Sequence, residues 1–192
     1  MEFICAEEKQ WKEIKTIYME AFPKRERKPY FALGHSVKTK KAVVMAATEG
    51  EQVLGFIVLI PYKDMVMADY LAVSSKVRSR GTGSYIMQNV CRQYKDKKIV
   101  LLIERLDDKA ENKEQRIARR KFYLKNGFTS SDIFYNGSKR GNGDYEFRRK
   151  GFGRSVYRSA EICAWNGDVQ DCPRSKWQRK RRIRKREEAD QG

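Results

Sequence analysis

The amino-acid sequence predicts an α/β fold in which a mixed sheet lies between helices. Two observations lead to this prediction. Segments with apolar residues at helical spacing alternate with shorter segments of strand character. One of the shorter segments, Lys98–Glu104, is an almost continuous apolar run, which is typical of a central strand covered on both faces. The pattern holds to about residue 148, and a chain of 192 residues can bury a sizeable core.

The first part of the chain is expected to contain two helices and four strands. Apolar residues at three- and four-residue spacings from Glu7 to Phe22 indicate an amphipathic helix, which Pro23 ends. A shorter helix is expected over 29–38. The strands are expected at 2–5, 42–48, 52–60 and 64–73, and Glu49-Gly50-Glu51 is typical of a hairpin turn between the second and the third.

The second part begins with a helical pattern from Tyr85 to Tyr94, which strand 98–104 follows. A helix over 110–125 is expected next, with Asn126-Gly127 as its cap. Two further strands are expected at 128–135 and 144–148, around a glycine-rich turn.

The composition limits the class of protein. The net charge of +17 favours contact with anions of many kinds, from nucleic acid to a phosphorylated cofactor. No apolar run approaches the length of about 20 residues that spans a bilayer, and the first residues lack the pattern of a signal peptide, so we expect a cytoplasmic protein. Four scattered cysteines and one histidine do not predict a metal site.

The most informative segment joins strand 64–73 to the helix that follows it. It reads Arg78-Ser79-Arg80-Gly81-Thr82-Gly83-Ser84. Two glycines at a strand-to-helix junction let the backbone come close to a bound group. The start of the helix offers unpaired N–H donors and the positive end of its dipole, which together favour a phosphate.

Two motifs in this chain resemble the GNAT superfamily of N-acetyltransferases, which use acetyl-CoA. Residues Arg78 to Gly83 match the pyrophosphate loop of that family, Gln/Arg-x-x-Gly-x-Gly/Ala, directly after a strand. The segment Phe122-Tyr123-Leu124-Lys125-Asn126-Gly127-Phe128 matches its second signature, a helix that ends in Tyr-x-x-x-Gly-Phe. One apolar strand separates the two motifs, as in the family, and the resemblance covers roughly residues 1–148.

The resemblance implies a mostly antiparallel sheet in which two central strands splay apart around the acyl-CoA. The pantetheine arm would bind the free backbone groups of Leu71, Ala72 and Val73, and the N–H of Val73 would stabilise the oxyanion. The pyrophosphate would bind the glycine loop, with Arg78, Ser79, Arg80, Gly81, Thr82, Gly83 and Ser84 as its contacts.

The resemblance also implies catalytic roles. Tyr123 stands where family members commonly carry the tyrosine that protonates the departing thiolate, and a phenol is protonated at neutral pH. The attacking amine must lose a proton. Glu104, at the end of the apolar strand, is the first candidate for the base; Asp69 and a water chain are the alternatives. The alternative is that Glu104 has a structural role only, as a residue that ends its strand and forms an ion pair.

One position departs from the family pattern. Family members often place a cofactor-binding asparagine seven residues before the tyrosine, where this chain has Arg116. Either Arg116 contacts a CoA phosphate, or Asn112, one helical turn earlier, serves from a shifted position.

The expected function is therefore acetyl-CoA-dependent transfer to a primary amine, with the acceptor unidentified and the chain a monomer or homodimer. The alternative is a basic protein that binds nucleic acid or ribosomes on the same scaffold, through residues 174–186. Residues 149–192 match no part of the family and are expected to form a poorly ordered basic extension. Three interpretations of that extension are open: a functional tail with weak nucleic-acid contact, a disordered segment, and the product of a shifted reading frame.

Overall fold

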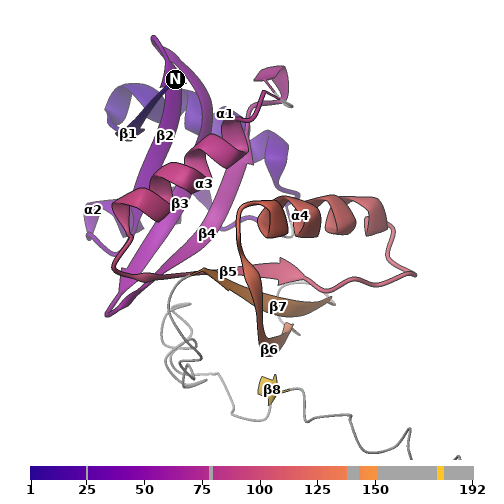
Figure 1. The fold of residues 1–192 in the computed structure, drawn as a ribbon. Coiled ribbons are helices and arrows are strands. Elements are labelled where there is room, and N and C mark those ends of the chain that lie inside the picture. The colour runs from indigo at the N-terminus through magenta and orange to yellow at the C-terminus, as the bar shows by residue number, and fades with distance from the viewer. Residues whose placement is uncertain (25, 78–79, 138–142, 151–176, 180–192) are drawn as a thin grey trace, which may run out of the picture.

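A computed structural model describes residues 1–24, 26–77, 80–137, 143–150 and 177–179 (Figure 1). From Ser130 onward only the backbone is described. Within these residues one sheet has the strand order β1-β2-β3-β4-β5-β7-β6-β8. The strands are β1 (Glu2–Cys5), β2 (Val43–Glu49), β3 (Gln52–Tyr62), β4 (Met65–Val73), β5 (Lys98–Glu104), β6 (Thr129–Gly137), β7 (Gly143–Lys150) and β8 (Trp177–Arg179).

The sheet is mixed and mostly antiparallel. The pair β4–β5 is parallel, and the other neighbouring pairs are antiparallel. The parallel pair arises because α3 connects the two strands as a crossover, which a tight hairpin cannot provide. The predicted fold class is confirmed.

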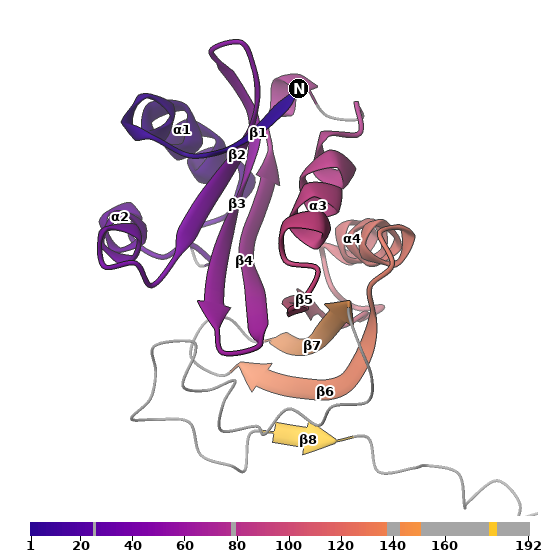
Figure 2. The same ribbon diagram turned by 60° about the vertical axis from the view of Figure 1, so that its left-hand side comes forward.

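Helices cover both faces of the sheet, as Figure 2 shows. On one side lie α1 (Trp11–Ala21) and α2 (Tyr30–Lys38), and on the other α3 (Thr82–Gln93) and α4 (Lys113–Lys125). Each layer has its own core because successive side chains of a strand point to opposite faces. In β3, for example, the fully buried Phe56 packs in the α1–α2 layer and its neighbour Ile57 in the α3–α4 layer.

The predicted first residues of three helices were wrong. The helix expected from Glu7 begins as a single 3-10 turn, η1 (Glu8–Gln10), held by the reciprocal capping contacts of Glu7 and Gln10. The helix with apolar periodicity from Tyr85 already starts at Thr82. The helix expected from 110 starts at Lys113, because turns centred on 107–112 use the preceding backbone groups.

A β-bulge in β4 bends this strand at the middle of the sheet. Tyr70 lies opposite Val58 and Ala68 opposite Leu59, so Asp69 is an extra residue without a partner in β3. Pairing between β4 and β5 stops at the same place: it joins Met65–Ala68 to Lys98–Leu101. Beyond it β4 runs on to Val73 with no register to β5 among the described residues, and the two strands diverge (Figure 2). The splay expected from the family resemblance is therefore present.

Most of the expected extension at 149–192 lies outside the described residues, and the predicted domain boundary at 148 stays a prediction. Among the helices that the structure describes, none has the length and apolar character to cross a membrane.

Candidate functional site

The two glycines of the loop serve different purposes. Gly81 immediately precedes α3 with φ +79°, a left-handed conformation that residues with a Cβ rarely adopt. Gly83 has an ordinary φ, but a Cβ there would lie 3.2 Å from Cε2 of the Phe122 ring in α4. The backbone conformation thus favours the first glycine, and the close approach of α3 to α4 favours the second.

The start of α3 presents free N–H groups. The first backbone bond inside the helix runs from the N–H of Tyr85 to the carbonyl of Gly81, at 2.9 Å. The N–H groups of Thr82, Gly83 and Ser84 precede it, and the N-cap residue Gly81 has no side chain that could cap them. Three such donors at the positive end of a helix are suited to bind an anion. Arg80 is exposed beside them, whereas Arg78 and Ser79 lie outside the described residues.

The two sequence motifs meet in space. Nδ2 of Asn126, at the end of α4, donates a hydrogen bond to Oγ of Ser84 at 3.3 Å and another to the carbonyl of Phe122 at 2.9 Å. Gly127 follows with φ +82°, as its predicted capping role requires, and turns the chain so that Phe128 is fully buried. The start of α3 and the end of α4 are therefore held together.

Tyr123 lies inside the α3–α4 layer, with 9% of its surface exposed. Its ring packs at right-angled geometry against Phe122 and Phe128, with centroids 5.0 and 5.8 Å away. Burial raises the pKa of Tyr123 to about 12, although the positive charge of Arg119 works in the opposite direction. Among the described residues its hydroxyl makes no hydrogen bond.

The free edge of β4 exposes backbone groups of alternate residues. The N–H of Ser74 bonds to the carbonyl of Leu54 in β3 at 2.8 Å. Because backbone groups alternate along a strand, those of Ala72 also face β3, and those of Leu71 and Val73 point away from it. Leu71 and Val73 thus provide the donors and acceptors on the side where β5 has diverged.

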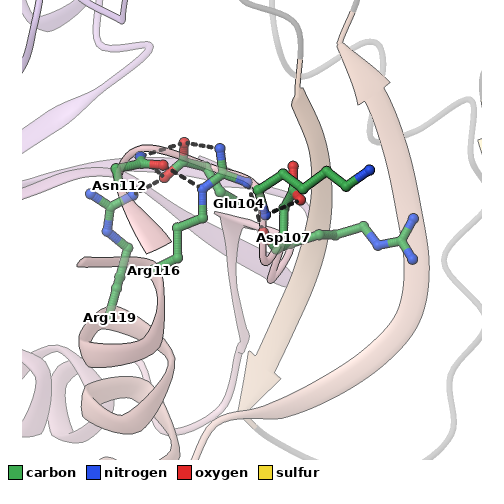
Figure 3. A network of polar contacts seen from close by, with 7 residues as sticks. Glu104, Asp107, Asn112, Arg116 and Arg119 are labelled. Atoms are coloured by element: carbon green, nitrogen blue, oxygen red, sulfur yellow. Dashed lines mark hydrogen bonds and ion pairs between the residues drawn. The ribbon is translucent and has the colours of Figure 1, made fainter. Parts of the chain in front are cut away.

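Glu104 lies at the centre of a polar network between β5 and α4 (Figure 3). Its carboxylate contacts Arg119 Nη1 at 2.9 Å, Arg116 Nη2 at 3.3 Å and Asn112 Nδ2 at 3.2 and 3.3 Å. Arg116 also donates to Asn112 Oδ1 at 2.7 Å and to the carbonyl of Arg105 at 2.9 Å. The side chains of Glu104 and Arg116 are each only 12% exposed.

This network bears on three of the predicted site residues. Both oxygens of Glu104 are engaged by two guanidinium groups and an amide, so the carboxylate would have to give up these contacts to accept a proton. Arg116 and Asn112 are likewise directed at Glu104 and at each other. The sequence analysis did not foresee this arrangement, although Asn112, Arg116 and Arg119 share one face of the helix at four- and three-residue spacings.

Asp69, the second candidate for the base, stands at the bulge where β4 leaves β5. Its Oδ2 lies 2.7 Å from Nζ of Lys28, which comes from the connection between α1 and α2, and its side chain is 15% exposed. The sequence analysis missed this pair. The two residues are far apart in the chain, and no local pattern relates them.

The sequence model of one protein family, the acetyltransferase (GNAT) domain, matches residues 40–130 of this chain. The matched region runs from the segment before β2 to the start of β6. The chain contains a GNAT acetyltransferase domain. The match includes the glycine loop, the free edge of β4 and Tyr123. It confirms the family resemblance and the prediction of an acyltransferase.

Solved structures share the GNAT fold. A structure described as a GNAT-family acetyltransferase from Bacteroides thetaiotaomicron is 19% identical, with a TM-score of 0.65 over 88% of this chain and 94% of that one. An aminoglycoside 6'-N-acetyltransferase complexed with coenzyme A is 14% identical, with a TM-score of 0.62 over 78% and 96%. The ribosomal-protein-S18-alanine N-acetyltransferase of Escherichia coli is 14% identical, with a TM-score of 0.60 over 82% and 99%. No curated protein matches the chain in sequence.

Proposed function

We propose that this protein transfers an acetyl group from acetyl-CoA to a primary amine by direct attack. The observation that carries the proposal is that the start of α3 lies beside both Val73 of the free edge of β4 and the end of α4, the helix that carries Tyr123. The aminoglycoside enzyme of similar fold is described as a complex with coenzyme A, which supports the same cofactor here.

The cofactor is proposed to bind with its pyrophosphate at the N–H groups of Thr82, Gly83 and Ser84, where Arg80 adds positive charge. The predicted contribution of Arg78 and Ser79 is kept as part of this site. From there the pantetheine arm extends along Leu71 and Val73, whose backbone groups face away from β3. Either of their N–H groups is suited to stabilise the oxyanion of the tetrahedral intermediate.

Tyr123 is proposed as the general acid. Its raised pKa keeps the phenol protonated throughout the physiological range, so it can donate a proton to the CoA thiolate as the C–S bond breaks. The absence of a competing hydrogen bond among the described residues leaves this proton available.

The base is proposed to be Asp69 rather than Glu104. A base must be able to accept a proton from the incoming ammonium, and the oxygens of Glu104 are held by Arg116, Arg119 and Asn112. Asp69 instead already contacts an ammonium group, that of Lys28, beside the free edge of β4.

Measurement of free thiol release tests the proposal. The panel of acceptors should include an aminoglycoside, a peptide with an N-terminal alanine, a polyamine and a lysine peptide, since similar folds are named for very different acceptors. We expect thiol release above the amine-free rate with at least one of them, and a large loss in Tyr123→Phe. Thiol release that no amine accelerates, in a protein that binds acetyl-CoA, would overturn the proposed reaction.

A further inference from the structure

Lys28 is held in an unusual environment for a lysine in a connecting segment. Its Nζ lies 2.7 Å from Oδ2 of Asp69 and 5.7 Å from the ring centre of Tyr70. Its backbone N–H donates to the Tyr70 hydroxyl at 3.2 Å, and its carbonyl accepts from the Tyr18 hydroxyl at 3.0 Å. The Tyr70 hydroxyl in turn donates to the carbonyl of Glu26 at 3.1 Å. The backbone on the N-terminal side of α2 is therefore fixed to β4.

This contact brings an amine to the free edge of β4. Asp69 is the bulged residue at which pairing with β5 ends, and Leu71, with its N–H on the free edge, stands two residues further along, about 7 Å away. The four-carbon stem of a lysine is flexible enough to span a distance of this order.

The direction of approach also fits an acceptor. The start of α3 lies on one face of the sheet, whereas α1 and α2 lie on the opposite face (Figure 2), and Lys28 belongs to the connection between these two helices. A cofactor that enters from the α3 side and lies along β4 would meet the Lys28 amine from the other side. Donor and acceptor would then not compete for the same space.

We propose that Lys28 is an acetyl acceptor of this protein, so that the chain acetylates itself within one molecule. This inference rests on the proposed function. It assigns to the same site a protein amine that is part of the chain, and it explains why a lysine side chain is directed at Asp69.

The chemistry balances without another reactant. Asp69 accepts one proton from the Lys28 ammonium, and the neutral amine attacks the thioester carbon. The C–N bond forms, the nitrogen gives its second proton to solvent water, and the C–S bond breaks with the electron pair on sulfur. The thiolate receives a proton from Tyr123, which solvent restores. The products are the Lys28 amide, CoA thiol and one released proton. The amide carries no charge, so the ion pair with Asp69 is lost.

Mass spectrometry of the full chain incubated with acetyl-CoA, without added amine, tests this inference. We expect one added acetyl group of about 42 Da, mapped to Lys28, in the native chain. The exposed Lys12 and Lys38, from the same helical layer, are internal controls for uncatalysed modification. Lys28 should react at least about tenfold faster than either of them when the chain is native, and no faster after denaturation.

Three further measurements sharpen the test. The rate at Lys28 should not depend on protein concentration, because the reaction is intramolecular; a proportional rise would contradict self-acetylation. Asp69→Asn should slow it about tenfold, and an unchanged rate would contradict the geometry. Lys28→Arg, which keeps the positive charge beside Asp69, should abolish the single addition.

The same sample separates this inference from the proposed function. If acetyl-CoA raises the melting temperature but Lys28 reacts no faster than Lys12 and Lys38, self-acetylation is wrong and the proposed function stands. If acetyl-CoA neither stabilises the protein nor modifies it, both are wrong.

Discussion

Asn126 Nδ2 donates a hydrogen bond to Ser84 Oγ, and this 3.3 Å contact joins the two motifs that identify the domain. Ser84 belongs to the first turn of α3 and Asn126 is the C-terminal cap of α4. The start of α3 and the end of α4, the helix that carries Tyr123, are therefore in direct contact. A substitution at this contact should affect the position of both.

The contact of Asn126 can be tested by Asn126→Leu, which keeps the approximate size of the side chain but has no polar group to bond Ser84 or the Phe122 carbonyl. Two hydrogen bonds are lost at a residue that is 9% exposed, so we expect unfolding to become easier by about 1–3 kcal/mol. Ser84→Ala loses one bond and should cost less. Equal stability of both variants and the parent in urea unfolding would show that this contact does not hold α3 to α4.

The packing of Gly83 against Phe122 predicts a rescue. Gly83→Val places side-chain atoms where a Cβ alone would lie 3.2 Å from the Phe122 ring, and overpacking of this kind costs about 1–3 kcal/mol. Phe122→Leu in the same chain removes the edge of the ring and should recover part of the loss. A double-mutant cycle measures this coupling. Strictly additive changes in the free energy of unfolding would mean that the two residues are not in steric contact.

Gly81 provides the matched control for Gly83. A Cβ at Gly81 meets no atom within 4 Å, but the residue has φ +79°. Gly81→Ala should therefore destabilise the protein by about 1–2 kcal/mol through backbone strain alone, and Phe122→Leu should not rescue it. Rescue of both variants by the same change would argue for a general relaxation of α4.

Glu104 should matter for stability more than for proton transfer. Glu104→Gln leaves Arg116 with a weakened partner at 12% exposure, which should cost about 2 kcal/mol and lower the melting temperature by about 4–8 °C. Asp108→Asn removes the exposed ion pair with Lys113 and should change the melting temperature little. In assays of acetyl transfer, Asp69→Asn should reduce turnover more strongly than Glu104→Gln does, because Asp69 is the proposed base. The reverse result would restore Glu104 as the base.

The pKa of Tyr123 predicts a dependence of stability on alkaline pH. The folded chain raises this pKa from 10.0 to about 12, so between these values the unfolded chain loses a proton that the folded chain retains. Stability is unaffected by this group below pH 10 and falls as the pH rises toward 12. Tyr123→Phe should make that fall shallower in unfolding curves measured across the interval. An identical slope in the variant would contradict the burial of the phenol.

The sequence was sufficient for the motifs, because their chemistry is local. A glycine pair at a strand-to-helix junction and a Gly-Phe after a helix indicate particular backbone conformations, and Gly81 and Gly127 have the positive φ values expected of such positions. The strand character of Lys98–Glu104 was equally readable, since a central strand needs apolar residues on both faces.

The environment of the candidate bases was not readable from the sequence. The bulge at Asp69 is a shift of a single residue in the register with β3, and the packing of two layers sets it. The contacts of Glu104 with Arg116 and Arg119 and of Asp69 with Lys28 depend on which helix or connection the fold places beside each strand. For that reason the sequence alone favours Glu104 as the general base, whereas the contacts in the folded chain favour Asp69.

Thermal unfolding with and without acetyl-CoA is the most direct test of the central claim, that the start of α3 and the free edge of β4 bind this cofactor. A ligand that binds only the folded chain adds about 2.7 kcal/mol at about 100 times its Kd. For a chain of this size, that corresponds to a rise of about 5–10 °C in melting temperature. We expect such a rise, reduced in Gly81→Ala. An unchanged melting temperature of the parent protein at millimolar acetyl-CoA would contradict the account.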